Sequence, residues 1–141
     1  MANDITLALR TDVALRAHRR CEYCLIREED TAFRPQVDHV VSRKHGGNSL
    51  PENLAYACVL CNRRKSGDVA SIDSDSDSGQ LVRLFHPRQD LWKDHFQIDG
   101  SSIRAITEVG AATAKLLHFN VPERRAERAL LQTLGSYPTE S

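Results

Sequence analysis

The sequence has no long hydrophobic run, and this absence limits where the protein can work. None of its apolar stretches approaches the roughly 18 residues that a membrane-spanning helix needs. The first residues, Met1 to Asp4, lack the basic head and apolar core of a secretory signal. We therefore expect a cytoplasmic protein with no membrane partner. In that reducing compartment, paired cysteines are more often metal ligands than disulfides.

The sequence also lacks an internal repeat and a net charge. Its 141 residues are 40% apolar and 27% charged, which is typical of a globular domain with, at most, an extension. The net charge of zero hides an uneven distribution. From Arg10 to Lys65 there are eleven basic and seven acidic side chains, whereas from Ser66 to Gly100 there are three and seven. The basic first half suits a polyanion, although a solvated surface of mixed charge has a similar composition.

Hydrophobic patterning predicts an α+β chain with four segments: 1–20, 21–70, 71–80 and 81–141. The first is a helical lead-in, with Thr11 and Asp12 as candidate caps of a short helix. The third alternates serine and aspartate and fits a solvated turn better than a calcium loop, because Leu84 stands where such a loop needs a glutamate. The fourth is a hairpin and helical extension, with strands at Leu81–Phe85 and Phe96–Ile98, a turn at Asp99-Gly100, and helices over 106–119 and from Pro122 to just before Gly135.

The second segment is predicted to fold as a hairpin followed by a helix. Val37–Val41 is rich in β-branched residues and predicts the first strand, and Leu54–Cys58 predicts the second. Ser49 and Glu52 have the spacing of a capping box between the two strands. The helix is expected over Cys61–Gly67.

Two Cys-x-x-Cys pairs, Cys21/Cys24 and Cys58/Cys61, are the most specific pattern in the chain. Together they supply four thiolates, the full complement of a closed tetrahedral zinc site. The 33 residues between the pairs must then fold as a unit of their own. With all four positions filled by sulfur, this zinc has no open site and cannot activate water, so we interpret it as structural.

Catalysis therefore requires a second centre, and three residues between and after the pairs are candidates. Asp38 and His39 are adjacent on a predicted strand, and Asn62 directly follows Cys61. Carboxylate and amide oxygens are ligands suited to Mg²⁺ or Mn²⁺. The imidazole of His39 has a pKa near working pH, which suits a general base.

These motifs together resemble the HNH endonuclease family, in the form with a four-cysteine structural zinc. The resemblance spans Cys21–Lys65 and consists of Cys-x-x-Cys, Asp-His, Gly-Gly-Asn with Glu-Asn-Leu, and Cys-x-x-Cys-Asn-Arg-x-Lys. Leu84–Arg88 and Trp92–Phe96 are similar to the C-terminal extension of a group of small bacterial HNH proteins.

The resemblance implies a ββα-metal (His-Me finger) core stapled by zinc, and metal-dependent hydrolysis of DNA phosphodiester bonds. It implies that His39 is the general base and that Asn53 braces the loop that orients it. Asp38 and Asn62 are then the ligands of a catalytic Mg²⁺ or Mn²⁺. Many members have histidine where Asn62 stands, so this chain is an HNN variant.

Five basic residues near these motifs are candidate phosphate contacts: Arg43, Lys44, Arg63, Arg64 and Lys65. DNA is thus the expected partner, and the sequence leaves open whether the protein is a monomer or a homodimer. The alternative function is a zinc-stapled module that binds nucleic acid without cleaving it. An intact set of Asp38, His39 and Asn62 argues against that alternative.

Overall fold

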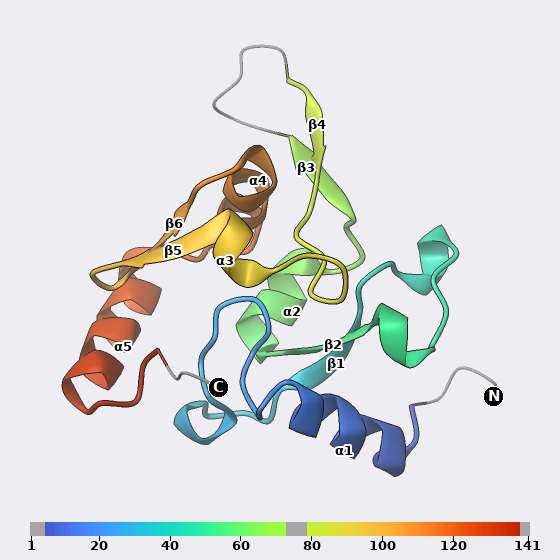
Figure 1. Cartoon of the computed structure of the whole chain (residues 1–141), viewed down its shortest axis with the longest axis horizontal. Helices are drawn as coiled ribbons and strands as arrows, with labels where there is room; N and C mark the ends of the chain where they lie inside the picture. The colour runs from blue at the N-terminus through green and yellow to red at the C-terminus, as the bar shows by residue number, and fades with distance from the viewer. Residues whose placement is uncertain (1–4, 73–78, 139–141) are drawn as a thin grey trace.

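The computed structural model describes residues 5–72 and 79–138, which form short helices around three separate two-stranded antiparallel sheets (Figure 1). The helices are α1 (Leu7–Arg16), α2 (Val59–Lys65), α3 (Trp92–His95), α4 (Glu108–Leu116) and α5 (Pro122–Thr133), with 3-10 turns η1 (Glu28–Asp30), η2 (Arg43–His45) and η3 (Pro51–Asn53). The strands pair as β1 (Gln36–His39) with β2 (Leu54–Ala57), β3 (Ala70–Ile72) with β4 (Leu81–Arg83), and β5 (Phe96–Asp99) with β6 (Ser102–Ala105). This mixture agrees with the predicted α+β class.

The β1–β2 hairpin and α2 occupy the middle of the molecule, between α5 and the loop at residues 43–53 (Figure 1). The register places Asp38 opposite Ala55 and His39 opposite Leu54. Cys58 caps α2, because its sulfur accepts a hydrogen bond from the Cys61 N–H. The helix therefore begins two residues before the predicted start, immediately after the cap.

The N-terminal helix α1 begins earlier than predicted. Thr6 is its cap, and the Thr6 hydroxyl accepts a hydrogen bond from the Leu9 N–H at 3.1 Å. Thr11, which the sequence suggested as a cap, instead donates its hydroxyl to the Leu7 carbonyl at 2.9 Å, one turn back within the helix. The prediction of a cap at Thr11 or Asp12 is thus wrong, because the helix starts one turn before them.

The predicted capping box is also wrong. The residue that precedes η3 is Leu50, and no side chain caps this turn. The Ser49 hydroxyl lies instead 2.9 Å from His39 Nε2. Tertiary proximity of the two strand ends therefore gives Ser49 a different partner from the one that local spacing suggested.

The C-terminal segment forms the hairpin and helices that the sequence predicted. The turn between β5 and β6 contains Gly100 with φ of 59°, a conformation that favours glycine. The strand expected to reach Phe85 ends at Arg83, because Leu84 and Phe85 turn into the core. Residues 73–78, most of the acidic turn, lie outside the described part of the chain. Among the described residues, no helix is long and apolar enough to cross a bilayer.

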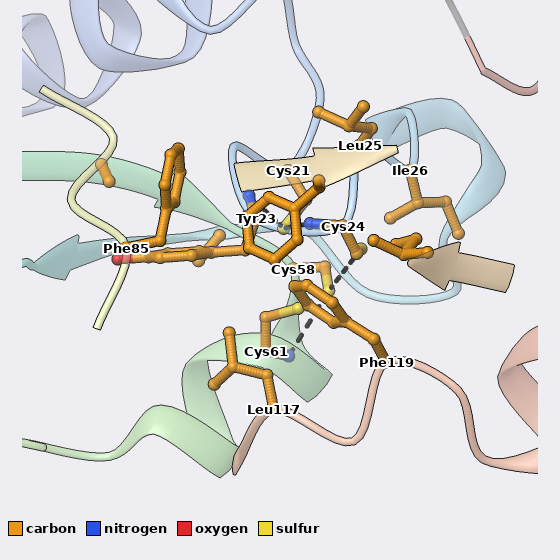
Figure 2. Packing of buried hydrophobic residues seen from close by; sticks show 14 of the residues in the cluster. Cys21, Tyr23, Cys24, Leu25, Ile26, Cys58, Cys61, Phe85, Leu117 and Phe119 are labelled. Atoms are coloured by element: carbon orange, nitrogen blue, oxygen red, sulfur yellow. Dashed lines mark hydrogen bonds between the residues drawn. The ribbon is translucent and has the colours of Figure 1, made fainter. Parts of the chain in front are cut away.

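The main core joins the two Cys-x-x-Cys pairs to the C-terminal segment. All four cysteines are buried in one cluster that also contains apolar residues of the C-terminal segment, from Phe85 to Tyr137. Figure 2 shows Leu117 and Phe119, which lie between α4 and α5, packed beside Cys58 and Cys61. Phe96 stacks edge-on against Phe119, with ring centroids 5.7 Å apart. The C-terminal segment is thus part of the same core as the cysteines.

Helix α5 is anchored by Arg128, which is only 3% exposed. Its Nε donates to the Ser101 carbonyl at 2.7 Å, and its NH2 group donates to the Phe119 carbonyl at 2.6 Å and to Asn120 Oδ1 at 3.1 Å. One guanidinium therefore satisfies three oxygens. It holds α5 against Ser101, just before β6, and against Phe119 and Asn120, shortly after α4.

We expect Arg128→Gln to lower the free energy of unfolding by about 3 kcal/mol, since these oxygens lose a charged donor. Urea denaturation followed by circular dichroism measures the change. The matched control is Arg125→Gln on the same helix, which is exposed and should change stability by less than about 0.5 kcal/mol. Equal stability of the two variants would contradict the anchoring role of Arg128.

Candidate active site and metal centre

The four cysteine sulfurs converge on one point in the core. All four side chains are buried, and their Sγ atoms lie within 4.8 Å of one another. A tetrahedral zinc with Zn–S bonds of about 2.3 Å separates its sulfurs by about 3.8 Å. The Cys24 and Cys58 sulfurs are 3.7 Å apart. Donor type and spacing therefore both fit a structural zinc, and the cysteines are positioned to bind a metal ion.

A thiolate centre buried at this point needs compensating positive charge. Burial raises the pKa of the Cys21 and Cys61 thiols, because a thiolate loses its hydration in the core. Metal ligation requires all four sulfurs as thiolates. Their negative charge must then be balanced by groups inside the protein.

A second site lies beside β1 and α2, in a hollow of about 310 Å³. Three of the residues that the sequence singled out for catalysis, Asp38, His39 and Asn62, line this hollow together with Arg43. β1 supplies the Asp-His pair, and α2 supplies the asparagine. The hairpin and the helix that carries Cys61 thus bring these residues to one place.

His39 is half-buried at the end of β1, with its Nε2 2.9 Å from the Ser49 hydroxyl. Burial lowers the pKa of His39, and the positive charges of Arg43 and Lys65 lower it further, while Asp38 opposes the shift. These effects favour the neutral imidazole, the form that can accept a proton. His39 therefore has the protonation state that a general base needs at neutral pH.

Asp38 precedes His39 on β1 and is 4% exposed. Its Oδ2 accepts a hydrogen bond from the Tyr23 hydroxyl at 2.7 Å and lies 3.2 Å from the Lys65 ammonium. Its Oδ1 has only a 3.4 Å contact with the same ammonium. Burial raises the pKa of Asp38, and Lys65 and Tyr23 oppose that rise. The carboxylate is thus fixed through Oδ2, with Oδ1 the less engaged oxygen.

Lys65 does not lie where the sequence led us to expect it. Its side chain is 1% exposed, and besides Asp38 it contacts the carbonyls of His39 at 3.3 Å and Val40 at 3.0 Å. This burial contradicts the prediction that Lys65 contacts phosphate. One signal was available: Lys65 is four residues after the buried Cys61, and so shares the inward face of α2.

Asn53 is buried at the start of β2 and bridges the loop that joins the two strands. Its Oδ1 accepts the Val41 N–H at 2.9 Å, and its Nδ2 donates to the carbonyls of Val41 at 2.9 Å and Asn48 at 2.8 Å. The loop can pass this close because residue 47 is glycine: a Cβ there would lie 1.7 Å from the Val41 carbonyl oxygen. This bracing fixes the backbone two residues after His39.

The remaining predicted residues lie on or beside the hollow. Asn62 donates its amide N–H to the Gln36 side chain, an orientation that leaves its oxygen out of that bond. Four of the five predicted basic residues are exposed: Arg43, Lys44, Arg63 and Arg64.

Sequence reasoning missed three groups that act on these sites. Tyr23, between the first two cysteines, fixes Asp38, and Ser49 contacts His39. Arg124, from α5, reaches the cysteine sulfurs. No local spacing links any of these residues to its partner, so only the folded chain reveals the contacts.

Comparison with known protein families identifies one that matches part of the chain. The model of the HNH endonuclease family matches residues 21–68, which include the four cysteines, the β1–β2 hairpin and α2. This match confirms the resemblance noted in the sequence. No curated protein and no solved structure matches the chain.

We expect the purified protein to hold about one zinc per chain. Because the only cysteines are these four, iodoacetamide should modify none of them until a chelator is added, and then all four. Cys58→Ser should lose the metal and unfold at a lower temperature than the zinc-loaded protein. Metal content by atomic emission and alkylation by mass spectrometry test this. Full alkylation of zinc-loaded protein would contradict the assignment.

Proposed function

Residues 21–68 form an HNH endonuclease domain, and we propose that the protein is a metal-dependent endonuclease that hydrolyses DNA phosphodiester bonds on a ββα-metal core. The observation that supports this most is the hollow lined jointly by Asp38, His39 and Asn62. The residues that line it include a histidine, two residues with oxygen-donor side chains and the cation Arg43, which are the residue types that metal-assisted hydrolysis of a phosphodiester uses.

His39 is the general base. With a neutral imidazole held beside Ser49 at the rim of the hollow, it can take the proton of a water that attacks phosphorus. Asn53 is a positioning residue: by fixing both backbone groups of Val41, it sets the direction in which the end of β1 presents the imidazole.

Asp38 and Asn62 are the proposed ligands of the catalytic divalent ion. The pair fits because Tyr23 and Lys65 orient the carboxylate mainly through Oδ2, and ligating carboxylates are commonly held by such outer hydrogen bonds. A bound Mg²⁺ or Mn²⁺ would supply positive charge to the scissile phosphate and the leaving oxygen. Lys65 offsets part of the charge of the buried Asp38.

Arg43, Lys44, Arg63 and Arg64 are the proposed contacts to flanking phosphates. Arg43 lines the hollow and Lys44 follows it on η2, while Arg63 and Arg64 follow Asn62, another lining residue, on α2. Such contacts position DNA without reading its sequence. Lys65 is left out of this set because its ammonium is buried.

We expect His39→Ala to reduce nicking of supercoiled plasmid in Mg²⁺ or Mn²⁺ by at least about 100-fold, since the reaction loses its general base. The matched control is His45→Ala, which removes an exposed imidazole from the same loop and should cleave at close to the wild-type rate. Thermal melting and zinc content should be unchanged in both variants.

Cleavage by His39→Ala at the wild-type rate would overturn the assigned role of His39. A different outcome is that the wild-type protein fails to cleave DNA with any of the metals while its binding of DNA stays salt-sensitive. That result would make the non-catalytic binding module the correct function.

The phosphate contacts are tested by binding rather than cleavage. In a His39→Ala background, Arg63→Gln with Arg64→Gln should weaken binding of every DNA sequence to a similar degree. The slope of log K against log salt should fall in magnitude by roughly 2, one for each lost contact. Fluorescence anisotropy at several salt concentrations measures it. Arg104→Gln with Arg125→Gln, two exposed residues outside the domain, is the charge-matched control, and an equal loss in that control would refute the assignment.

A further inference from the structure

One guanidinium from the C-terminal segment enters the four-cysteine centre. Arg124, in the first turn of α5, is 7% exposed. Its NH2 group donates to the Cys61 sulfur at 3.3 Å and to the Cys58 sulfur at 3.9 Å. Its NH1 group donates to the Leu117 carbonyl at 2.8 Å, and its Cζ lies 5.8 Å from the centre of the Phe119 ring. The guanidinium is thus held in a fixed orientation toward two of the metal ligands.

A buried arginine normally has an anionic partner, because an unpaired charge in the core is very costly. Among the described residues, the ion pairs include no carboxylate partner for Arg124. The sulfurs of Cys58 and Cys61 are the anionic groups to which it donates hydrogen bonds. Their thiolate form is therefore what makes the burial of this guanidinium favourable.

The net charge of the zinc-loaded centre also favours a cation beside the sulfurs. Four thiolates around a divalent ion carry a net charge of −2, in a region from which water is excluded. The fixed positive charge of Arg124 offsets part of it, and charge-assisted N–H donation holds the two sulfurs in place.

We propose that Arg124 is a positioning residue of the zinc centre, which holds the sulfurs of Cys58 and Cys61 in the geometry that ligates the metal and so slows its loss. Arg124 lies 56 residues beyond the end of the matched domain at residue 68. The C-terminal segment therefore completes the metal centre of the domain. The proposal depends on zinc at the four cysteines and not on nuclease activity.

A purely mechanical role is the main competing explanation, since Arg124 also bonds the Leu117 carbonyl and helps dock α5. Arg128 separates the two roles. It is buried on the same helix, and its guanidinium donates to three oxygens of the described residues rather than to sulfur. Arg128→Gln thus loosens α5 without removing a donor from the metal ligands.

The test is the rate at which the full-length, zinc-loaded protein gives up zinc to a colorimetric chelator. We expect Arg124→Gln to release zinc about 10–100-fold faster than wild type, the range found when outer partners of metal ligands are removed. Arg125→Gln should release zinc at the wild-type rate. Arg128→Gln should release zinc much more slowly than Arg124→Gln does. Glu127→Gln, which removes a negative charge from the same side of α5, should not speed release.

Replacing zinc with cobalt gives an absorption spectrum that reports on the sulfur ligands. Loosening of α5 alone would not change the energy of its sulfur-to-cobalt band. Loss of N–H donation leaves the sulfurs more electron-rich, so the sulfur-to-cobalt charge-transfer band of Arg124→Gln should shift to lower energy. The band of Arg128→Gln should stay at the wild-type position. Equal release rates for Arg124→Gln and Arg128→Gln, or an unshifted band in Arg124→Gln, would overturn the proposal.

If Arg124→Gln does not fold, Arg124→Lys decides. Lysine keeps the charge but loses the planar fork that bonds a carbonyl and the sulfurs together. Zinc release should be faster than wild type, with the cobalt band shifted. A wild-type rate and band in Arg124→Lys would show that the contact to sulfur has no effect on the metal.

Discussion

The convergence of four sulfurs on one point is the constraint on which the rest of this structure depends. It ties the turn at Cys21–Cys24 to the start of α2, across 33 intervening residues. The same cysteines shape the local backbone, since Cys58 caps α2 while Cys61 faces inward from its first turn. Once α2 is fixed in this way, Asn62 has to project beside the end of β1. The cysteine cluster thus fixes the geometry of the proposed active site without taking part in the proposed chemistry.

Buried charge beside this hairpin falls into two groups. In the first, the Asp38 carboxylate contacts the Tyr23 hydroxyl and the Lys65 ammonium. In the second, Arg124 donates to the cysteine sulfurs. Such groups are expensive to desolvate, and they are tolerated only when their geometry is specific. They therefore restrict the ways in which α2 and α5 can pack against the hairpin, more than apolar contacts alone would do.

The C-terminal segment is integrated with the domain because it supplies what the small hairpin lacks. A two-stranded sheet with one short helix buries too little apolar surface to be stable alone. Phe96, Leu117 and Phe119 extend the core around the cysteines, and Arg124 and Arg128 bring α5 onto it. A division into a catalytic domain and an independent appendage would miss this shared core.

The sequence by itself determined the features that depend on short spacing. The two cysteine pairs, the Asp-His pair, the asparagine after Cys61, the helical segments after residue 105 and the turn at Gly100 all follow from local chemistry. Only the tertiary structure decided which partners meet across long separations: Ser49 with His39 rather than as a helix cap, Lys65 with Asp38 rather than at the surface, and Arg124 with Cys61, 63 residues away. The physical reason is that a local pattern specifies backbone conformation, whereas the partner of a polar side chain depends on which segments the core brings together.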